Sequence, residues 1–284
     1  MGTEVRAIDR VNKRITKHSL AVVGIVLMII ILYFPIGIPL SVSPPTQDFF
    51  DSLNARSKGD KVAFGITMGS IPLYNYYATG FASVVNYMVD RGLKIIFIPG
   101  DPDSLTGVLD LFKRVDFAGK KYVYGVDYMV MPFTTGAEVG MAAIAADMRG
   151  LFEKDPFGNV IADLDIMQGV NTIGDVQLTV TTYYGFDEGP RYVRQWASKY
   201  NVPMLTIADF ATTAQYYKIN VFGNLYWVRG LAEFEFLAKK PGVELISMDM
   251  RNVLAFLCFG TIIVGNLARI GRRAEKVQGE ATKK

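Results

Sequence analysis

Polar side chains recur just after the predicted strands of this chain, where an α/β fold gathers its ligands. Because the carboxyl ends of parallel strands lie at one edge of a sheet, we expect these side chains to converge there. The candidate ligand-binding rim consists of Ser70, Asp101, Asp103, Asp187, Glu188 and Asp209, with Thr134, Thr135, Glu138 and Thr212 beside them.

Carboxylates predominate in this rim, so the ligand it suits is a divalent cation or a cationic or polyhydroxy molecule. Hard cations prefer oxygen ligands, and Asp101, Asp103 and Asp187 are the candidate metal ligands. A divalent cation is thus the one cofactor that the sequence suggests. Phosphate is disfavoured by the acidic charge, and neither a GxGxxG nor a GxxxxGK[ST] motif follows the first strand.

The same residues are also typical helix caps. Asp101, Pro102 and Asp103 have the form of an N-cap, a proline at the first helical position and an acid in the first turn. Thr135 and Glu138 have the spacing of a capping box, and Asp209 is placed to cap a helix in the same way. The sequence leaves both interpretations open.

Histidine chemistry is nearly excluded, because His18 is the only histidine and it precedes the first apolar run. A Ser-His-Asp triad, a Cys-His pair and a histidine-based zinc site are therefore ruled out in the domain that follows. A hydrolase would need a carboxylate, lysine or metal mechanism, for instance Asp101 or Asp103 facing Asp187 or Glu188 as in a glycosidase.

Two apolar runs predict membrane spans. Residues 19–47 carry no charge, and the part at 20–38 has the length of about 20 residues that crosses a bilayer. This run is too long for a signal peptide and ends without a cleavage site. The second run, 252–268, lies between Arg251 and Arg269 and contains Cys258, the single cysteine.

The charge distribution predicts the topology. Both ends are basic: residues 1–18 carry a net +3 and residues 269–284 a net +4, so the middle carries 3 − 3 − 4 = −4 of the total of +3. By the positive-inside rule both termini lie in the cytoplasm. The pI near 8.8 belongs to these tails and is no evidence for nucleic-acid binding.

We therefore predict a cell-membrane protein with two spans and its large domain outside. The expected parts are cytoplasmic tails at 1–18 and 271–284, transmembrane helices at 19–41 and 250–270, and an extracytoplasmic domain at 42–249.

The domain alternates apolar strands with helices. Strands are expected at 61–67, 93–98, 122–131, 176–183 and 203–208, and helices at 47–57, 71–90, 103–117, 135–152, 190–200 and 224–239. Continuous apolar strands of this length are typical of a parallel sheet covered on both faces. The fold class is α/β: a doubly wound, mostly parallel five-stranded sheet, flavodoxin-like or Rossmann-like, between two transmembrane helices.

The stretches GIPLSVSP at 37–44, TQDFFDSL at 46–53, GDKVAFG at 59–65 and KIIFI at 94–98 resemble those of uncharacterised prokaryotic two-span membrane proteins with an external α/β domain. The resemblance covers most of the chain and implies no defined activity.

The sequence therefore favours a membrane-anchored extracytoplasmic binding or assembly module, a non-catalytic subunit of a larger membrane complex. The alternatives are an extracytoplasmic metal-assisted hydrolase that uses the acidic rim and a solute-binding domain that serves a partner transporter. The expected partners are membrane lipid and a homo- or hetero-oligomer formed through the transmembrane helices and the external domain, with no nucleic acid.

Overall fold

The computed structural model describes residues 17–34, 36, 41–68, 70–185, 187–208 and 221–281. The chain divides into two compact units, Pro39–Leu245 and the pair Met1–Ile38 with Ile246–Lys284. The first is an α/β domain and the second is a helical unit.

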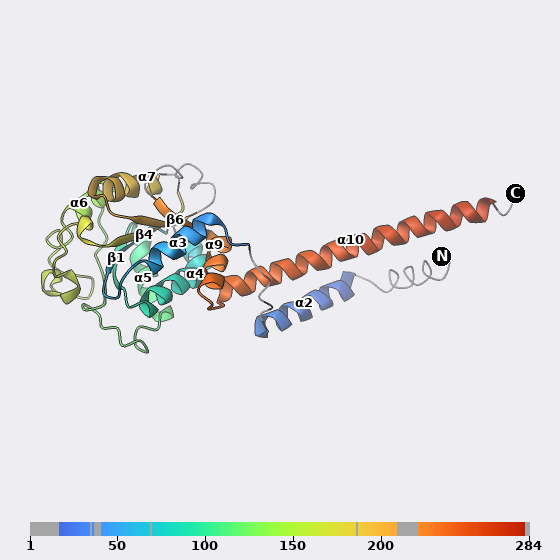
Figure 1. Ribbon diagram of the computed structural model, residues 1–284, viewed down its shortest axis with the longest axis horizontal. Helices are drawn as coiled ribbons and strands as arrows, with labels where there is room; N and C mark the ends of the chain where they lie inside the picture. Colours follow the sequence, from blue (N-terminus) through green and yellow to red (C-terminus); the bar gives the residue numbers. More distant parts are fainter. Residues whose placement is uncertain are drawn as a thin grey trace. The chain divides into compact units, whose positions relative to one another are not determined.

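A six-stranded parallel sheet forms the centre of the α/β domain (Figure 1). The strand order is β3-β2-β1-β4-β5-β6, which is the order of a Rossmann fold. The strands are β1 (Lys61–Ile66), β2 (Lys94–Pro99), β3 (Tyr128–Val130), β4 (Leu178–Tyr183), β5 (Met204–Ala208) and β6 (Val221–Tyr226).

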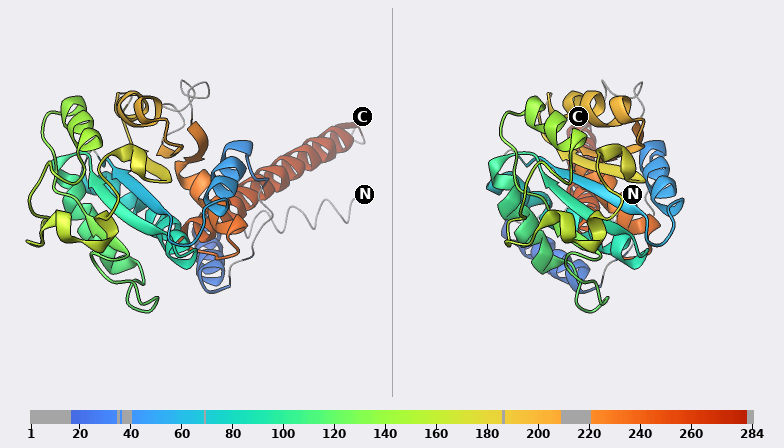
Figure 2. Two further views of the ribbon diagram at one scale, coloured as in Figure 1. Left: turned by 60° about the vertical axis from the view of Figure 1, so that its left-hand side comes forward. Right: turned by 90° about the vertical axis from the view of Figure 1, so that its left-hand side faces the viewer.

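Helices cover both faces of this sheet, so the domain has three layers (Figures 1 and 2). The helices are α3 (Pro44–Asn54), α4 (Ile71–Asp90), α5 (Pro102–Arg114), α6 (Glu138–Ala146), α7 (Glu188–Tyr192) and α9 (Trp227–Leu237). A π-helical segment, η4 (Val193–Ser198), continues α7, and the 3-10 turns η1 (Ile161–Asp163), η2 (Asp165–Met167) and η3 (Ile173–Asp175) precede β4.

The two cores follow from the alternation of side chains along each strand. In β1, Phe64 and Ile66 face the core that contains α3, α4, α5 and α9. Ala63 faces the opposite core, which contains α6, α7 and η4. Strands β1, β2, β4 and β5 are buried on both faces and are accordingly rich in apolar and β-branched residues. Together with the strand order, this confirms the predicted doubly wound parallel sheet.

All five predicted strands are present in the sheet, and residues 221–226 add a sixth strand, β6, that was not predicted. The helix expected at 224–239 accordingly begins at Trp227. Gly223 and Leu225 of β6 are buried, and β6 pairs with β5 after a register shift between Met204 and Leu205. A short apolar run beside a helix carries little periodicity of its own, so tertiary pairing decides its conformation.

Two further predicted elements are shorter than expected. The third strand, expected at 122–131, is β3 (Tyr128–Val130), and the helix expected at 135–152 is α6 (Glu138–Ala146). Gly136 and Ala137 have positive φ angles of 91° and 48°, which cannot belong to a right-handed helix, so α6 starts after them.

The helical unit contains α2 (Lys17–Tyr33) and most of the 39-residue helix α10 (Val243–Ala281). Of the described helices, the segment Val243–Leu267 of α10 alone is long and apolar enough to cross a membrane. The apolar part of α2, Leu20–Tyr33, is shorter than a span. The predicted first span at 19–41, and with it the two-span topology, therefore remains a prediction.

Candidate functional site

The strand order identifies one position in the fold at which a ligand is expected. Between β1 and β4 the chain reverses its direction of travel across the sheet, since β1 is followed outward by β2 and β3, and β4 by β5 and β6. In open α/β sheets ligands bind at such a switch point, beyond the carboxyl ends of the strands. Thr67 follows β1 there, and Tyr184 and Gly185 follow β4.

A buried hydroxyl pair lies at this point. The Thr67 Oγ1 and Tyr192 Oη atoms are 2.8 Å apart, and Tyr192, on α7, is 1% exposed. A Cβ atom at Gly100 would lie 2.2 Å from Thr67 Oγ1 and 2.7 Å from Tyr192 Oη. Glycine after β2 is therefore required for β1, β2 and α7 to bring these hydroxyls together.

Two carboxylates act on the Tyr192 phenol. Burial raises its pKa first, and the negative charges of Asp101 and Glu188 raise it further, against the hydrogen bond with Thr67 that lowers it. The phenol thus keeps its proton and remains a hydrogen-bond donor. We call Thr67, Asp101, Glu188 and Tyr192 the switch-point cluster.

Both carboxylate oxygens of Asp101 accept backbone hydrogen bonds. Its Oδ1 atom accepts the backbone N–H of Ser104 at 2.8 Å, and its Oδ2 atom accepts that of Met68 at 2.6 Å. The first bond confirms that Asp101 is the N-cap residue of α5, as predicted, and Pro102 is the first residue of that helix. The second ties the end of β1 to the start of α5, so the carboxylate fixes the geometry of the switch point.

The Glu188 carboxylate differs from that of Asp101, because its Oε2 atom is buried and has no hydrogen-bond partner among the described residues. The carboxylate lies against Gly185, where a Cβ atom would be 2.1 Å from Oε2. Thr182 Oγ1, at the fully buried end of β4, likewise has no hydrogen-bond partner among the described residues. A buried acceptor without a donor costs about 1–3 kcal/mol, and a ligand that carries donors would remove this cost.

The other predicted rim residues do not all join the cluster. Ser70 is the N-cap residue of α4 but makes no side-chain capping bond. Asp103 is exposed in the first turn of α5, and Asp187 is exposed and pairs with Arg191 at 3.6 Å. Asp209 and Thr212 lie outside the described residues.

The predicted capping box of Thr135 and Glu138 is wrong. The N-cap of α6 is Ala137, and no side chain caps it. Glu138 instead accepts two hydrogen bonds from Arg194, at 2.9 and 2.8 Å, and one from Gln195 at 2.9 Å. Arg194 first, and then Gln195, lower the pKa of Glu138 to about 2. The positive φ angles before α6 redirect the chain, so the capping geometry cannot form.

The described residues do not form a cluster of ligands for the predicted divalent cation. In the part of the chain that the structure describes, no three His, Cys, Asp or Glu residues are grouped as cation ligands. Asp101 already accepts two backbone N–H groups. The arrangement at the switch point suits hydrogen bonding to a donor-rich ligand better than coordination of a metal.

A second group of carboxylates lies on α9, away from the predicted rim. Glu233 is fully buried and accepts the backbone N–H and hydroxyl of Ser43 at 3.0 and 2.6 Å, and Nε of Arg229 at 2.7 Å. Burial would raise the pKa of Glu233, but these hydrogen bonds hold it below its ordinary value. Because Ser43 is the N-cap residue of α3, Glu233 fixes the segment by which the chain enters the domain.

Glu235 fixes the segment by which the chain leaves the domain. Its carboxylate is 1% exposed and accepts Ser83 Oγ at 2.6 Å and the backbone N–H groups of Gly242 and Leu245 at 3.1 and 2.8 Å. It therefore caps the start of α10. Burial raises the pKa of Glu235 despite these donors.

Sequence reasoning missed Thr67, Tyr192 and the carboxylates of α9. Glu188 and Tyr192 are four positions apart, so a helix places them on one face, and this spacing was the available signal. Glu233 and Glu235 stand in an apolar helix, where a carboxylate is rarely buried without partners. Two of those partners, Ser43 and Ser83, are distant in sequence.

A comparison with protein-family models finds no match, and neither does a comparison with curated protein sequences.

Proposed function

We propose that this protein is a membrane-anchored, extracytoplasmic binding module that acts as a non-catalytic subunit of a larger membrane complex. Its α/β domain binds a hydroxyl-rich or cationic ligand at the switch-point cluster. The observation that carries the proposal is the buried Glu188 Oε2 atom, which lacks a partner among the described residues beside a phenol that keeps its proton. Together these groups offer an acceptor and a donor to a polar ligand.

The local backbone supports a binding role for this region. The π-helical segment η4 directly follows Tyr192, and π-helical turns occur frequently at functional sites. Trp196 of η4 is fully buried and donates its indole N–H to the Met141 carbonyl at 3.1 Å. The segment that carries Tyr192 is therefore held firmly, as a preorganised site requires.

A thermal-stability screen of the full-length protein in detergent tests this proposal, with sugars, polyols, amino acids and polyamines as probes. A ligand that binds only the native state at 100 times its Kd stabilises it by about 2.7 kcal/mol. We expect Glu188→Gln to weaken binding about tenfold, since a hydrogen bond to a charged group is worth about 1.5–3 kcal/mol. Asp187→Asn, which changes the exposed neighbour, should leave affinity unchanged. The proposal fails if no probe raises Tm, or if both variants lose affinity equally.

The helical unit supports the assembly part of the proposal. An apolar groove of about 410 Å³ lies between α2 and α10 and is lined by residues that include Gly24, Leu254 and Leu257. Small residues at such a groove allow close approach of another helix. Blue-native electrophoresis after mild extraction should show a complex larger than the monomer, and a monodisperse monomer would contradict this.

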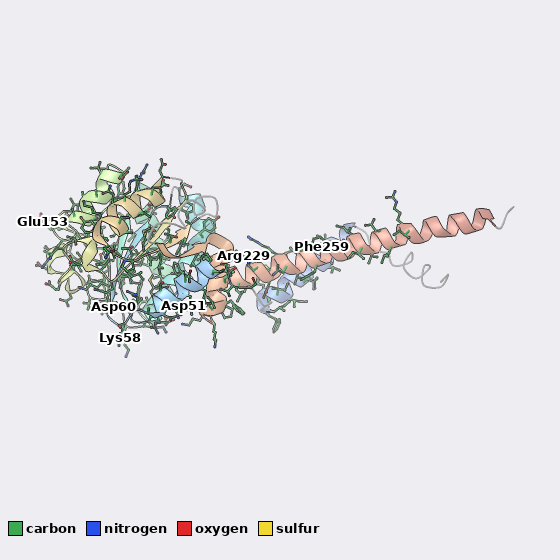
Figure 3. All side chains as sticks on the ribbon, turned by 45° about the horizontal axis from the view of Figure 1, so that its top comes forward. Asp51, Lys58, Asp60, Glu153, Arg229 and Phe259 are labelled. Atoms are coloured by element: carbon green, nitrogen blue, oxygen red, sulfur yellow. The ribbon has the colours of Figure 1, made fainter. Side chains whose placement is uncertain are left out.

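The two-span topology is tested by cysteine labelling, because Cys258 is the single cysteine. In a Cys258→Ser background, Glu153→Cys places a thiol on the domain surface (Figure 3). We expect a membrane-impermeant maleimide to label this thiol in intact cells and to leave a Thr3→Cys variant unlabelled. The reverse pattern would contradict the proposed orientation.

A further inference from the structure

Two adjoining cavities lie at the amino edge of the sheet, opposite the switch point. They measure about 330 and 270 Å³ and share Asp90 and Lys120 in their walls. Four cationic side chains line them: Lys58, Arg91, Lys120 and Lys240. Each comes from a different turn that follows a helix, α3, α4, α5 or α9, and Lys58 extends from the surface (Figure 3). We call these cavities together the basic groove.

Asp90 organises the groove by holding two lysines together. Its carboxylate, 18% exposed, forms a salt bridge with Lys120 at 2.6 Å and another with Lys240. Burial would raise the pKa of Asp90, but the hydrogen bonds from Lys120 and Lys240 keep it below its ordinary value. Each ammonium has three donors, so both lysines retain donors for a further anion.

The groove has a surplus of positive charge. Its four cations face two carboxylates, Asp90 and Glu235, and Glu235 is already engaged by Ser83 and by the backbone at the start of α10. The surplus of two positive charges contrasts with the net −4 of residues 19–268. A local excess of this sign in an acidic domain favours an anionic ligand.

An apolar wall faces these charges. Tyr87 and Phe234 meet edge to face with ring centroids 5.3 Å apart, and Ala238 and Pro241 continue the same wall of the larger cavity. At 330 Å³ this cavity lies at the small end of ligand sites, which run from about 300 Å³. It therefore suits a ligand with one anionic group and a short carbon skeleton.

We propose that the basic groove binds an organic phosphate ester, with the phosphate on Lys120 and Lys240 and the carbon skeleton against Tyr87 and Pro241. Lysine binds phosphate as a point charge, which matches ammonium groups that are held in place by Asp90. The site is distinct from the switch-point cluster and does not depend on it.

Two sources can supply this chemistry. Lys240 lies three positions before the first residue of α10, the helix that contains the candidate span, so a phospholipid headgroup is one source. A soluble sugar or glycerol phosphate is the other. The groups that recognise the ligand are the same in both cases.

The test uses the full-length protein in two arms. Calorimetric titration with glycerol phosphate measures the soluble ligand, and native mass spectrometry from phosphatidylglycerol or phosphatidylcholine nanodiscs measures retained lipid. We expect binding in at least one arm, with phosphatidylglycerol retained in preference to phosphatidylcholine if the source is lipid. Lys120→Gln with Lys240→Gln should weaken this binding by about tenfold or more, the loss expected for charged hydrogen bonds.

A matched pair, Lys113→Gln with Lys121→Gln, removes two charges from lysines that do not line the groove and should leave affinity within about twofold of the wild type. Replacing Lys120 and Lys240 by arginine keeps the charge and should preserve most of the binding. If the double glutamine variant unfolds, Lys240→Gln alone carries the comparison, because Lys240 is 57% exposed. Binding in neither arm, or an equal loss in the matched pair, overturns the proposal.

Discussion

Replacing Glu235 by glutamine should make the domain more stable at neutral pH than the wild type. The carboxylate is 1% exposed, and burial raises its pKa above the ordinary 4.5. Because the folded state binds this proton more tightly than the unfolded state, Glu235 contributes its stability below pH 4.5. That contribution is lost as the pH rises toward the higher pKa of the folded state. Glutamine resembles the protonated acid and does not titrate.

The size of the effect follows from proton linkage and from the hydrogen bonds. Where the folded and unfolded states differ by one bound proton, the free energy of unfolding changes by about 1.4 kcal/mol per pH unit. A glutamine carbonyl can accept the Gly242 and Leu245 N–H groups while its amide donates to the hydroxyl of Ser83, which can act as an acceptor. Glu235→Ala leaves those N–H groups without their acceptor and should cost about 2–5 kcal/mol.

Denaturant unfolding between pH 4 and 8, followed by tryptophan fluorescence, measures these differences; Trp196 is fully buried. The gain of Glu235→Gln over the wild type should grow with pH and then level off. Glu233, whose lowered pKa has the opposite effect, is present in both proteins and cancels. Glu153→Gln, on the exposed surface (Figure 3), should show no such trend. A constant difference, or one that shrinks as the pH rises, would refute the reasoning.

Three further predictions concern the carboxyl edge of the sheet. Gly65→Ala should destabilise the domain by about 1–3 kcal/mol, because a Cβ atom would lie 2.9 Å from the Trp196 ring; denaturant unfolding measures this. Asp101→Ala removes the acceptor of two backbone N–H groups and should cost about 2–4 kcal/mol in the same assay, whereas Asp101→Asn should cost less. NMR titration should find the pKa of Glu138 at about 2, so its stabilising effect is present above pH 4.5 and is lost as the pH falls toward 2; Arg194→Gln should move this pKa back toward 4.5.

The layered α/β fold was predictable because its signals are local. Buried parallel strands read as runs rich in apolar and β-branched residues, and β1, β2, β4 and β5 were all predicted from such runs. The capping role of Asp101 was also predictable, because it follows from three consecutive residues, Asp101, Pro102 and Asp103. The sixth strand was not predictable, because its conformation depends on pairing with β5 rather than on its own periodicity.

The candidate site was likewise predictable only where its signals are local in sequence. Glu188 was expected at the carboxyl edge from its position after a strand, but its buried oxygen was not. The pairing of Thr67 with Tyr192 joins positions 125 residues apart, and no spacing rule links them. The basic groove likewise brings together cationic side chains from four separate turns. Because these residues are far apart in sequence, the net charge of the chain does not reveal the local positive charge of the groove.

The two glutamates of α9 have a mechanical consequence. Ser43 and Glu233 are 190 positions apart in sequence, yet Glu233 and Glu235 hold the entry and exit segments of the domain to one helix. A pull on either segment is therefore resisted by hydrogen bonds to buried carboxylates of α9. Because one helix holds both connections, loosening either of them would break hydrogen bonds of a buried carboxylate on α9.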